Sequence, residues 1–213
     1  MERYVINGLD LVDINELAQG IADKSFNCVR LVYSLEQFYK NPVVSSDALT
    51  ANPSLMGKTS MDIFDETVNA LTNAGLMVIL NNHISDAMWC CSTTDRNGLW
   101  HNHNYSDDQW IQAITNMSGR YANNSLVVGN DLRNEIRDDT LELLWPTWGT
   151  GSESVDWRGA AIRGGNSILK VAPNQLIIVE GLNFANDMAP IKDNPIQLDL
   201  PNKLVYSYHY YSW

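Results

Sequence analysis

The chain has 213 residues, of which 45% are hydrophobic, and this is enough to bury one substantial core. Its net charge of -11 at pH 7 argues against a nucleic acid or an anionic membrane as partner, because surfaces that bind phosphate groups are basic. A neutral ligand such as a sugar is compatible with this charge, and no apolar run reaches the length of a transmembrane helix.

Short apolar runs alternate along the chain with segments of helical periodicity. In chain order, helical spacing is found in residues 14–24, 61–74, 107–121 and 156–171. Apolar runs typical of buried parallel strands occupy residues 26–32, 76–82, 126–132, 176–180 and 204–208. Asp107 and Asp156 stand at the start of helical segments and suit N-cap positions. The alternation predicts an α/β fold with a parallel sheet.

The links between these elements differ in length according to their direction. Links from a helix to the next strand are short, whereas links from a strand to the next helix are long, at residues 33–60, 83–106, 135–155 and 181–203. Long loops at the C-terminal ends of the strands are typical of a (β/α)8 barrel, whose active site is built there. A doubly wound sheet is the structural alternative, although no glycine-rich phosphate motif follows any strand.

Each predicted strand ends in polar residues that a core does not require. In chain order these are Arg30, Asn82 with His83, Asn134 with Glu135, Glu180, and His209 with Tyr211. A polar residue at one strand end is ordinary, because strand ends meet solvent. Five in succession, at the edge where parallel strands end together, favour a functional site.

The stretch "VVGNDLRNEIR", residues 127–137, is an apolar run that ends on an Asn-Glu pair between two arginines. The chemistry that fits is cleavage of a glycosidic bond, which needs a carboxylic acid and a second carboxylate. We expect Glu135 to be the acid/base, with a pKa raised by partial burial, and Asn134 to bind a substrate hydroxyl. The alternative for Glu135 is a structural ion pair with Arg133 or Arg137.

Six segments carry a family resemblance: "NCVRL", "LNNH", "LRNEIR", "WGTGSESVDWRGAAIRGGNSIL", "PNQLIIVEGLNF" and "VYSYHYY". Together they resemble glycoside hydrolase family 5, the cellulase family, and are similar to segments of microbial endo-β-1,4-glucanases. The resemblance runs from about Leu17 to Trp213. It implies a secreted, monomeric (β/α)8 barrel that hydrolyses a β-glucan or related polysaccharide by a retaining two-carboxylate mechanism, without a cofactor.

The resemblance also implies roles for single residues. Those matched to the catalytic machinery are Asn134 as the 2-hydroxyl ligand, Glu135 as the acid/base, Arg30 as the support of the nucleophile, and His209 with Tyr211 as the His-x-Tyr pair of strand six. His83 matches a substrate-binding histidine, and we expect Asn82 and Trp148 to be further substrate contacts. Ile136 departs from the family pattern, because many members have proline there, but this leaves the catalytic role intact.

The resemblance further implies that the chain covers strands two to six of the eight. Residues 1–213 are then a single catalytic-domain fragment that lacks strand one and strands seven and eight. The nucleophile, which family members carry at the end of strand seven, is then missing as well. We expect this chain alone to be inactive. Glu180 is a poor replacement for the nucleophile, because adjacent strand ends place it on the same side of a sugar as Glu135. We expect Glu180 to line the pocket or to fix a loop instead.

Two other functions are open to the sequence. His83, His101 and His103 could hold a metal in a hydrolase, but the last two lie inside a long loop, so we expect no metal. A non-catalytic sugar-binding module would need aromatic residues such as Trp100, Trp148 and Trp213. It would not need the set of arginine, Asn-Glu and His-x-Tyr that is present.

The chain has three cysteines, too few for a disulfide framework. We expect Cys28 to be a buried thiol. For Cys90 and Cys91, two free thiols are favoured over a vicinal disulfide, because adjacent cysteines strain the geometry that a disulfide requires.

Overall fold

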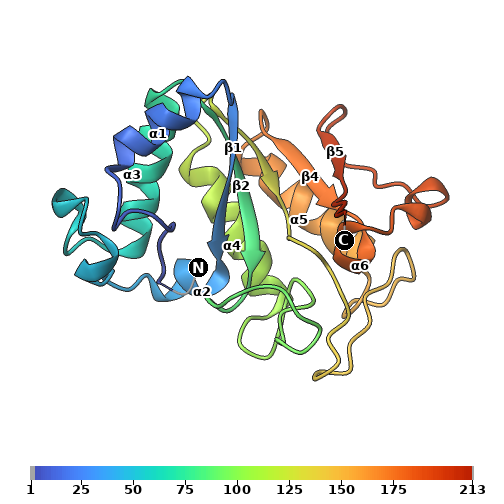
Figure 1. The fold of residues 1–213 in the computed structure, drawn as a ribbon. Helices are drawn as coiled ribbons and strands as arrows, with labels where there is room; N and C mark the ends of the chain where they lie inside the picture. The colour runs from blue at the N-terminus through green and yellow to red at the C-terminus, as the bar shows by residue number, and fades with distance from the viewer. Residues whose placement is uncertain (1–2, 213) are drawn as a thin grey trace.

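The computed structural model describes residues 3–212, so Trp213 lies outside the described residues. Its centre is one sheet of five parallel strands (Figure 1). The strands are β1 (Cys28–Ser34), β2 (Met77–Ile84), β3 (Val127–Asp131), β4 (Leu176–Glu180) and β5 (Leu204–Ser207). They are hydrogen-bonded in sequential order, β1-β2-β3-β4-β5. Because the order never reverses, the sheet has the connectivity of part of a barrel, and the doubly wound alternative is wrong.

Four long helices alternate with the strands, as the periodicity predicts, the first before β1 and the other three between successive strands. They are α1 (Ile14–Asp23), α3 (Ser60–Asn73), α4 (Asp107–Arg120) and α5 (Trp157–Val171). Figure 1 shows α1 and α3 on the side of β1, α4 behind β2, and α5 beside β4. The short helices inside the long links are not predicted, because they lack a full apolar period. These are α2 (Leu35–Lys40), α6 (Leu182–Ala185) and the 3₁₀ turns Ser46–Ala48, Pro53–Leu55 and Ala189–Lys192.

Of the two N-cap residues predicted from the sequence, one is correct and one is wrong. Asp156 caps α5, since its carboxylate accepts from the N–H of Gly159. Asp107 does not cap α4. Ser106 does so, in a capping box with Gln109, and Asp107 is the first helical residue.

Tryptophan side chains hold the sheet edge that carries the site. Trp100, Trp110 and Trp157 are fully buried, and their ring centroids lie 5.5 to 6.2 Å apart. The indole N–H of Trp110 donates to the carbonyl of Leu132, and that of Trp157 donates to the carbonyl of Glu180. The core between α4, α5 and the sheet therefore positions the backbone at the ends of β3 and β4.

The long links leave the C-terminal ends of the strands. The link after β2 runs from Ile84 to Asp107, and Figure 1 shows it beyond the arrowhead of β2. The sequence pattern predicts Arg30 at the end of its strand, but Arg30 lies in the middle of β1. His83 lies within β2. Among residues 3–212, no helix has the length and hydrophobicity to cross a bilayer.

Candidate active site

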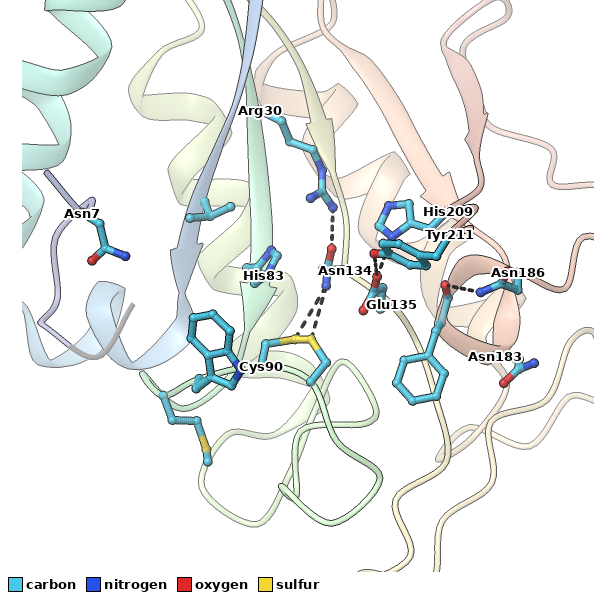
Figure 2. A pocket seen from close by; sticks show the side chains of 15 residues that line it. Asn7, Arg30, His83, Cys90, Asn134, Glu135, Asn183, Asn186, His209 and Tyr211 are labelled. Atoms are coloured by element: carbon cyan, nitrogen blue, oxygen red, sulfur yellow. Dashed lines mark hydrogen bonds and ion pairs between the residues drawn. A yellow bond between two sulfur atoms is a disulfide. The ribbon is translucent and has the colours of Figure 1, made fainter. Parts of the chain in front are cut away.

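An open cavity of about 830 Å³ lies at the C-terminal side of the sheet (Figure 2). Its lining comes from every strand region and from the loops between them. The lining residues are Asn7, Arg30, Val32, His83, Met88, Trp89, Cys90, Cys91, Asn134, Glu135, Asn183, Phe184, Asn186, His209 and Tyr211. Glu135 is the one carboxylic acid among these described lining residues.

Glu135 is held at three points. Its Oε1 accepts hydrogen bonds from Nδ1 of His209 and from the hydroxyl of Tyr211, both at 2.7 Å. Its backbone N–H donates to Oε2 of Glu180, also at 2.7 Å. The backbone of Glu135 has φ 49°, in the left-handed region that a residue with a Cβ seldom adopts. The hydrogen bond to Glu180 satisfies the buried backbone N–H of Glu135.

His209 bridges two carboxylates. Its Nδ1 contacts Glu135, and its Nε2 lies 3.2 Å from Oε1 of Glu180. Hydrogen bonds to Glu135 and Glu180 raise the pKa of His209 to about 9, so the imidazole is protonated at neutral pH.

This raised pKa predicts a pH dependence of stability. The folded pKa of about 9 exceeds the ordinary value of 6.5, so the stabilising contribution of His209 is complete below the lower value and is lost as the pH rises through the higher one. We expect the free energy of unfolding, measured by urea denaturation, to fall over this interval. The fall should be smaller in His209→Asn. Parallel curves for the two proteins would contradict the assignment.

The pKa of the Glu135 carboxyl is shifted in the direction opposite to the one predicted from the sequence. Burial raises its pKa, but the hydrogen bonds from His209 and Tyr211 outweigh burial, and the net effect lowers the pKa. The alternative of an ion pair with a neighbouring arginine is not observed. Arg137 pairs with Asp95 and donates to the backbone carbonyl of Glu135, and Arg133 donates to the carbonyl of Asn97.

Arg30, which lines the cavity, joins three acidic or amide groups. Its Nε donates to Asp131 at 2.7 Å, and its Nη2 donates to Oδ1 of Asn134 at 2.8 Å and to Oε1 of Glu180 at 2.7 Å. Since Oδ1 of Asn134 accepts from a guanidinium, the amide group of Asn134 has a defined orientation, and Figure 2 shows its Nδ2 directed toward the sulfurs of Cys90 and Cys91.

Three predicted substrate contacts do not line the cavity. Glu180 is fully buried and uses its carboxylate on Arg30, His209 and the N–H of Glu135. Asn82 is also fully buried, and its carbonyl accepts from the N–H of Asn134. Trp148 is buried, with its indole N–H donating to the carbonyl of Asn194. The side chains of these three residues are buried in the protein and do not line the cavity.

His83 does line the cavity, as predicted. Burial and the nearby charges of Arg30 and Arg133 lower its pKa to about 4, so the ring is neutral. Nδ1 lies 2.8 Å from Oδ1 of Asn81, which can only accept, so Nδ1 carries the proton and Nε2 is left as an acceptor. His101 and His103 contact other loop residues, Ser154 and Glu142, and do not join His83 in a group of possible metal ligands within residues 3–212.

Several lining residues have no signal in the sequence pattern. Asn7, Asn183, Phe184 and Asn186 come from loops, where side-chain direction has no period. Cys90 and Cys91 form a vicinal disulfide, so the prediction of two free thiols is wrong. Cys28 is a free thiol, as predicted, but it is half-buried rather than buried.

The sequential parallel strands bring an Asn-Glu pair and a His-x-Tyr pair to one cavity, as expected of part of a (β/α)8 barrel. The chain belongs to glycoside hydrolase family 5: the family model described as "Cellulase (glycosyl hydrolase family 5)" matches residues 7–213. The resemblance seen in the sequence is therefore confirmed.

Individual relatives agree with this family. The chain is 31% identical to an endoglucanase of Paenibacillus polymyxa, over 98% of the chain and 52% of the relative. It is also 31% identical to the major extracellular endoglucanase of Xanthomonas campestris pv. campestris, over 91% of the chain and 36% of the relative. The chain thus spans about half or less of these relatives.

Solved structures show the same fold. The catalytic domain of the major endoglucanase from Xanthomonas campestris pv. campestris superposes with a TM-score of 0.85 at 28% identity, covering 98% of this chain and 60% of that one. A hyperthermophilic endocellulase from Pyrococcus horikoshii also gives a TM-score of 0.85 at 28% identity, covering 98% and 59%. The five strands therefore correspond to part of a family 5 barrel.

Proposed function

We propose that these residues are the larger part of a retaining β-glycosidase barrel that cleaves β-1,4-glucan. The observation that carries the proposal is Glu135, the one carboxylic acid lining the described cavity, beside Asn134 and under His209 and Tyr211. The endoglucanase names of the relatives from Paenibacillus and Xanthomonas support a β-glucan as substrate.

Glu135 acts as the acid/base in this proposal. Cleavage requires a second carboxylate about 5–5.5 Å from the first, on the other side of the sugar. A negative charge at that distance raises the pKa of Glu135, which opposes the lowering by His209 and favours the protonated form. Once the second carboxylate is bonded to the sugar, this charge is gone. The pKa of Glu135 then falls, as a general base requires.

The neighbouring residues bind and orient the sugar. Nδ2 of Asn134 donates to the 2-hydroxyl, and Nε2 of His83 accepts from another hydroxyl. Arg30 holds the amide of Asn134 in place through Oδ1. Tyr211 and His209 keep Glu135 aimed into the cavity.

The nucleophile comes from outside these 213 residues. Glu180, the nearest other carboxylate, is fully buried and already bound to Arg30 and His209. We therefore assign this chain to strands two to six of a (β/α)8 barrel, as a single catalytic-domain fragment that is inactive alone. The barrel formed with strands one, seven and eight is called the complete barrel below. We propose that it works as a secreted monomer, consistent with the word extracellular in the name of the Xanthomonas relative.

The stereochemistry of the product tests the proposal. We expect the complete barrel to release cello-oligosaccharides whose first-formed anomer is β, as proton NMR of the early reaction would detect. An α anomer would mean an inverting enzyme. Binding of cello-oligosaccharides without hydrolysis would point to a non-catalytic sugar-binding relative. The described lining contains one carboxylate, and a protein that only binds sugars needs no second one.

A further inference from the structure

The cavity has an apolar wall that takes no part in the proposed bond cleavage. Four consecutive residues form it: Met88, Trp89, Cys90 and Cys91. Figure 2 shows the Cys90–Cys91 disulfide beside the amide of Asn134, on the side away from Arg30. Trp89 is 77% exposed to solvent and lines the cavity, so its side chain is accessible to a ligand there.

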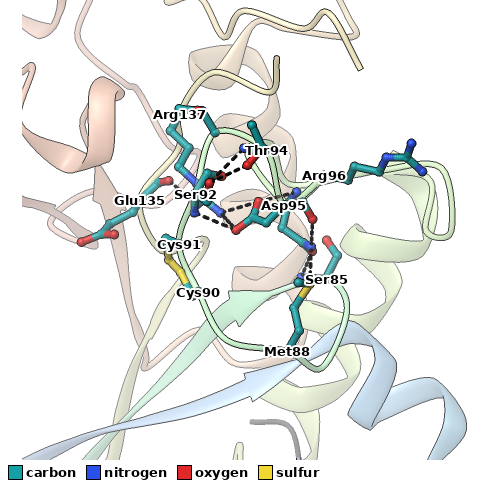
Figure 3. Close-up of polar contacts among 12 residues, drawn as sticks. Ser85, Met88, Cys90, Cys91, Ser92, Thr94, Asp95, Arg96, Glu135 and Arg137 are labelled. Atoms are coloured by element: carbon teal, nitrogen blue, oxygen red, sulfur yellow. Dashed lines mark hydrogen bonds and ion pairs between the residues drawn. A yellow bond between two sulfur atoms is a disulfide. The ribbon is translucent and has the colours of Figure 1, made fainter. Parts of the chain in front are cut away.

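This wall is attached to the acid/base through a buried arginine. Arg137 is 1% exposed, and its guanidinium donates to the carbonyl of Ser92, to both carboxylate oxygens of Asp95, and to the carbonyl of Glu135 (Figure 3). One rigid group therefore joins the residue after the disulfide to the backbone of Glu135.

The other end of the same loop is also fixed. A Cβ at Gly98 would lie 2.5 Å from the carbonyl oxygen of Arg137, so only glycine allows this close approach. Oδ1 of Asn97 accepts from the backbone N–H groups of Ser85 and Asp86. The loop that carries the disulfide is thus held by hydrogen bonds and close packing both before and after the disulfide.

The disulfide also faces the amide that is proposed to bind the 2-hydroxyl. Nδ2 of Asn134 lies 3.8 Å from Sγ of Cys90 and 3.6 Å from Sγ of Cys91. Disulfide sulfur is a weak acceptor and has no proton to donate. The hydrogen bonds from Nδ2 to the two sulfurs are therefore weak, and a sugar hydroxyl is a stronger acceptor for the same N–H groups.

A glucosyl unit with a β linkage matches such a wall. Its hydroxyls lie around the ring edge, so each face of the ring presents C–H groups. These pack well on aromatic rings and on polarisable sulfur. The polar groups of Asn134, His83 and Arg30 line the same cavity and are available to the ring edge.

We propose that the Cys90–Cys91 disulfide and Trp89 form a sugar-binding platform, which packs against the face of a β-glucosyl unit in the cleft while Asn134 binds its edge. The ligand class is a β-linked oligosaccharide with equatorial hydroxyls. The inference rests on the proposed function and adds the residues that select the sugar.

Two variants of the complete barrel test the platform. Trp89→Ala should raise KM for cellotetraose about 3- to 10-fold, as expected for loss of one aromatic contact. The double variant Cys90→Ser/Cys91→Ser should raise KM about 2- to 10-fold, because two hydrated hydroxyls replace an apolar surface. The matched controls are Trp145→Ala, whose tryptophan is exposed outside this cavity, and Cys28→Ser at the start of β1.

Further readouts separate binding from misfolding and from failure of the proposed function. Equal thermal midpoints for Trp89→Ala and Trp145→Ala should accompany the change in KM. Iodoacetamide added to the unfolded, unreduced protein should label Cys28 and leave Cys90 and Cys91 unlabelled in peptide mass spectra. The platform is wrong if these two cysteines are labelled, or if hydrolysis proceeds with unchanged KM in both site variants. If the wild-type complete barrel neither binds nor hydrolyses cello-oligosaccharides, the proposed function fails and the platform fails with it.

Discussion

Glu135→Gln in the complete barrel is expected to slow hydrolysis of β-1,4-glucan by about 10²- to 10⁴-fold, because glutamine cannot protonate the leaving oxygen. The amide keeps the size of the carboxyl group and can still contact His209 and Tyr211. We therefore expect KM to change little and the loss to fall on kcat, as measured by release of reducing sugar.

Substrates that need no protonation sharpen this test. Aryl glycosides with good leaving groups should lose much less rate in their first step, observed as a burst of phenol. Azide should restore turnover of Glu135→Ala and give a β-glycosyl azide, because azide attacks the glycosyl-enzyme without a general base. Glu153→Gln, at an exposed glutamate, is the matched control and should keep full activity. Equal losses on both substrate types, without azide rescue, would assign Glu135 a structural role.

Glu180→Ala is expected to cost about 3 kcal/mol of the free energy of unfolding, because it removes the fully buried partner of the partly buried Arg30 and His209. Glu180 is fully buried and accepts from Arg30, from His209 and from the N–H of Glu135. Without it, that N–H loses its acceptor at a residue whose φ is 49°, so activity should fall together with stability. Urea denaturation measures the first effect and glucan hydrolysis the second.

Glu180→Gln separates charge from shape. A glutamine side chain has one oxygen and one NH₂ group, whereas all three partners of Glu180 are donors. At least one donor must then face the NH₂ group, so we expect part of the stability loss to remain. Glu153→Ala should leave stability unchanged, since Glu153 is exposed. If Glu180→Ala kept wild-type stability but abolished hydrolysis, Glu180 would be acting on substrate and the assignment of an external nucleophile would be wrong.

Much of the site was predictable because parallel strands end at a common edge. Residues far apart in the chain, such as His83 in β2, Glu135 after β3 and His209 after β5, line one cavity although no local pattern links them. Their position follows from strand order and polarity alone. Their catalytic and binding roles stay predictions until the variants are measured.

Errors arose where the direction of a side chain mattered. Asn82 near the end of β2 and Glu180 at the end of β4 are polar, as the pattern requires, but both are fully buried and neither lines the cavity. A pattern of apolar and polar residues cannot tell a polar group that meets substrate from one that is paired inside the core. That distinction depends on partners supplied by other strands.

The sequence by itself determined the α/β class, the strands, the main helices and the edge that carries Asn134 and Glu135, because periodicity and strand polarity are local properties of the chain. Only the tertiary structure decided that Glu180 lies behind Glu135 and that the Cys90–Cys91 disulfide lies beside Asn134. The path of that loop depends on Arg137, which joins residues more than forty positions apart. Long-range hydrogen bonds of this kind leave no period in the sequence.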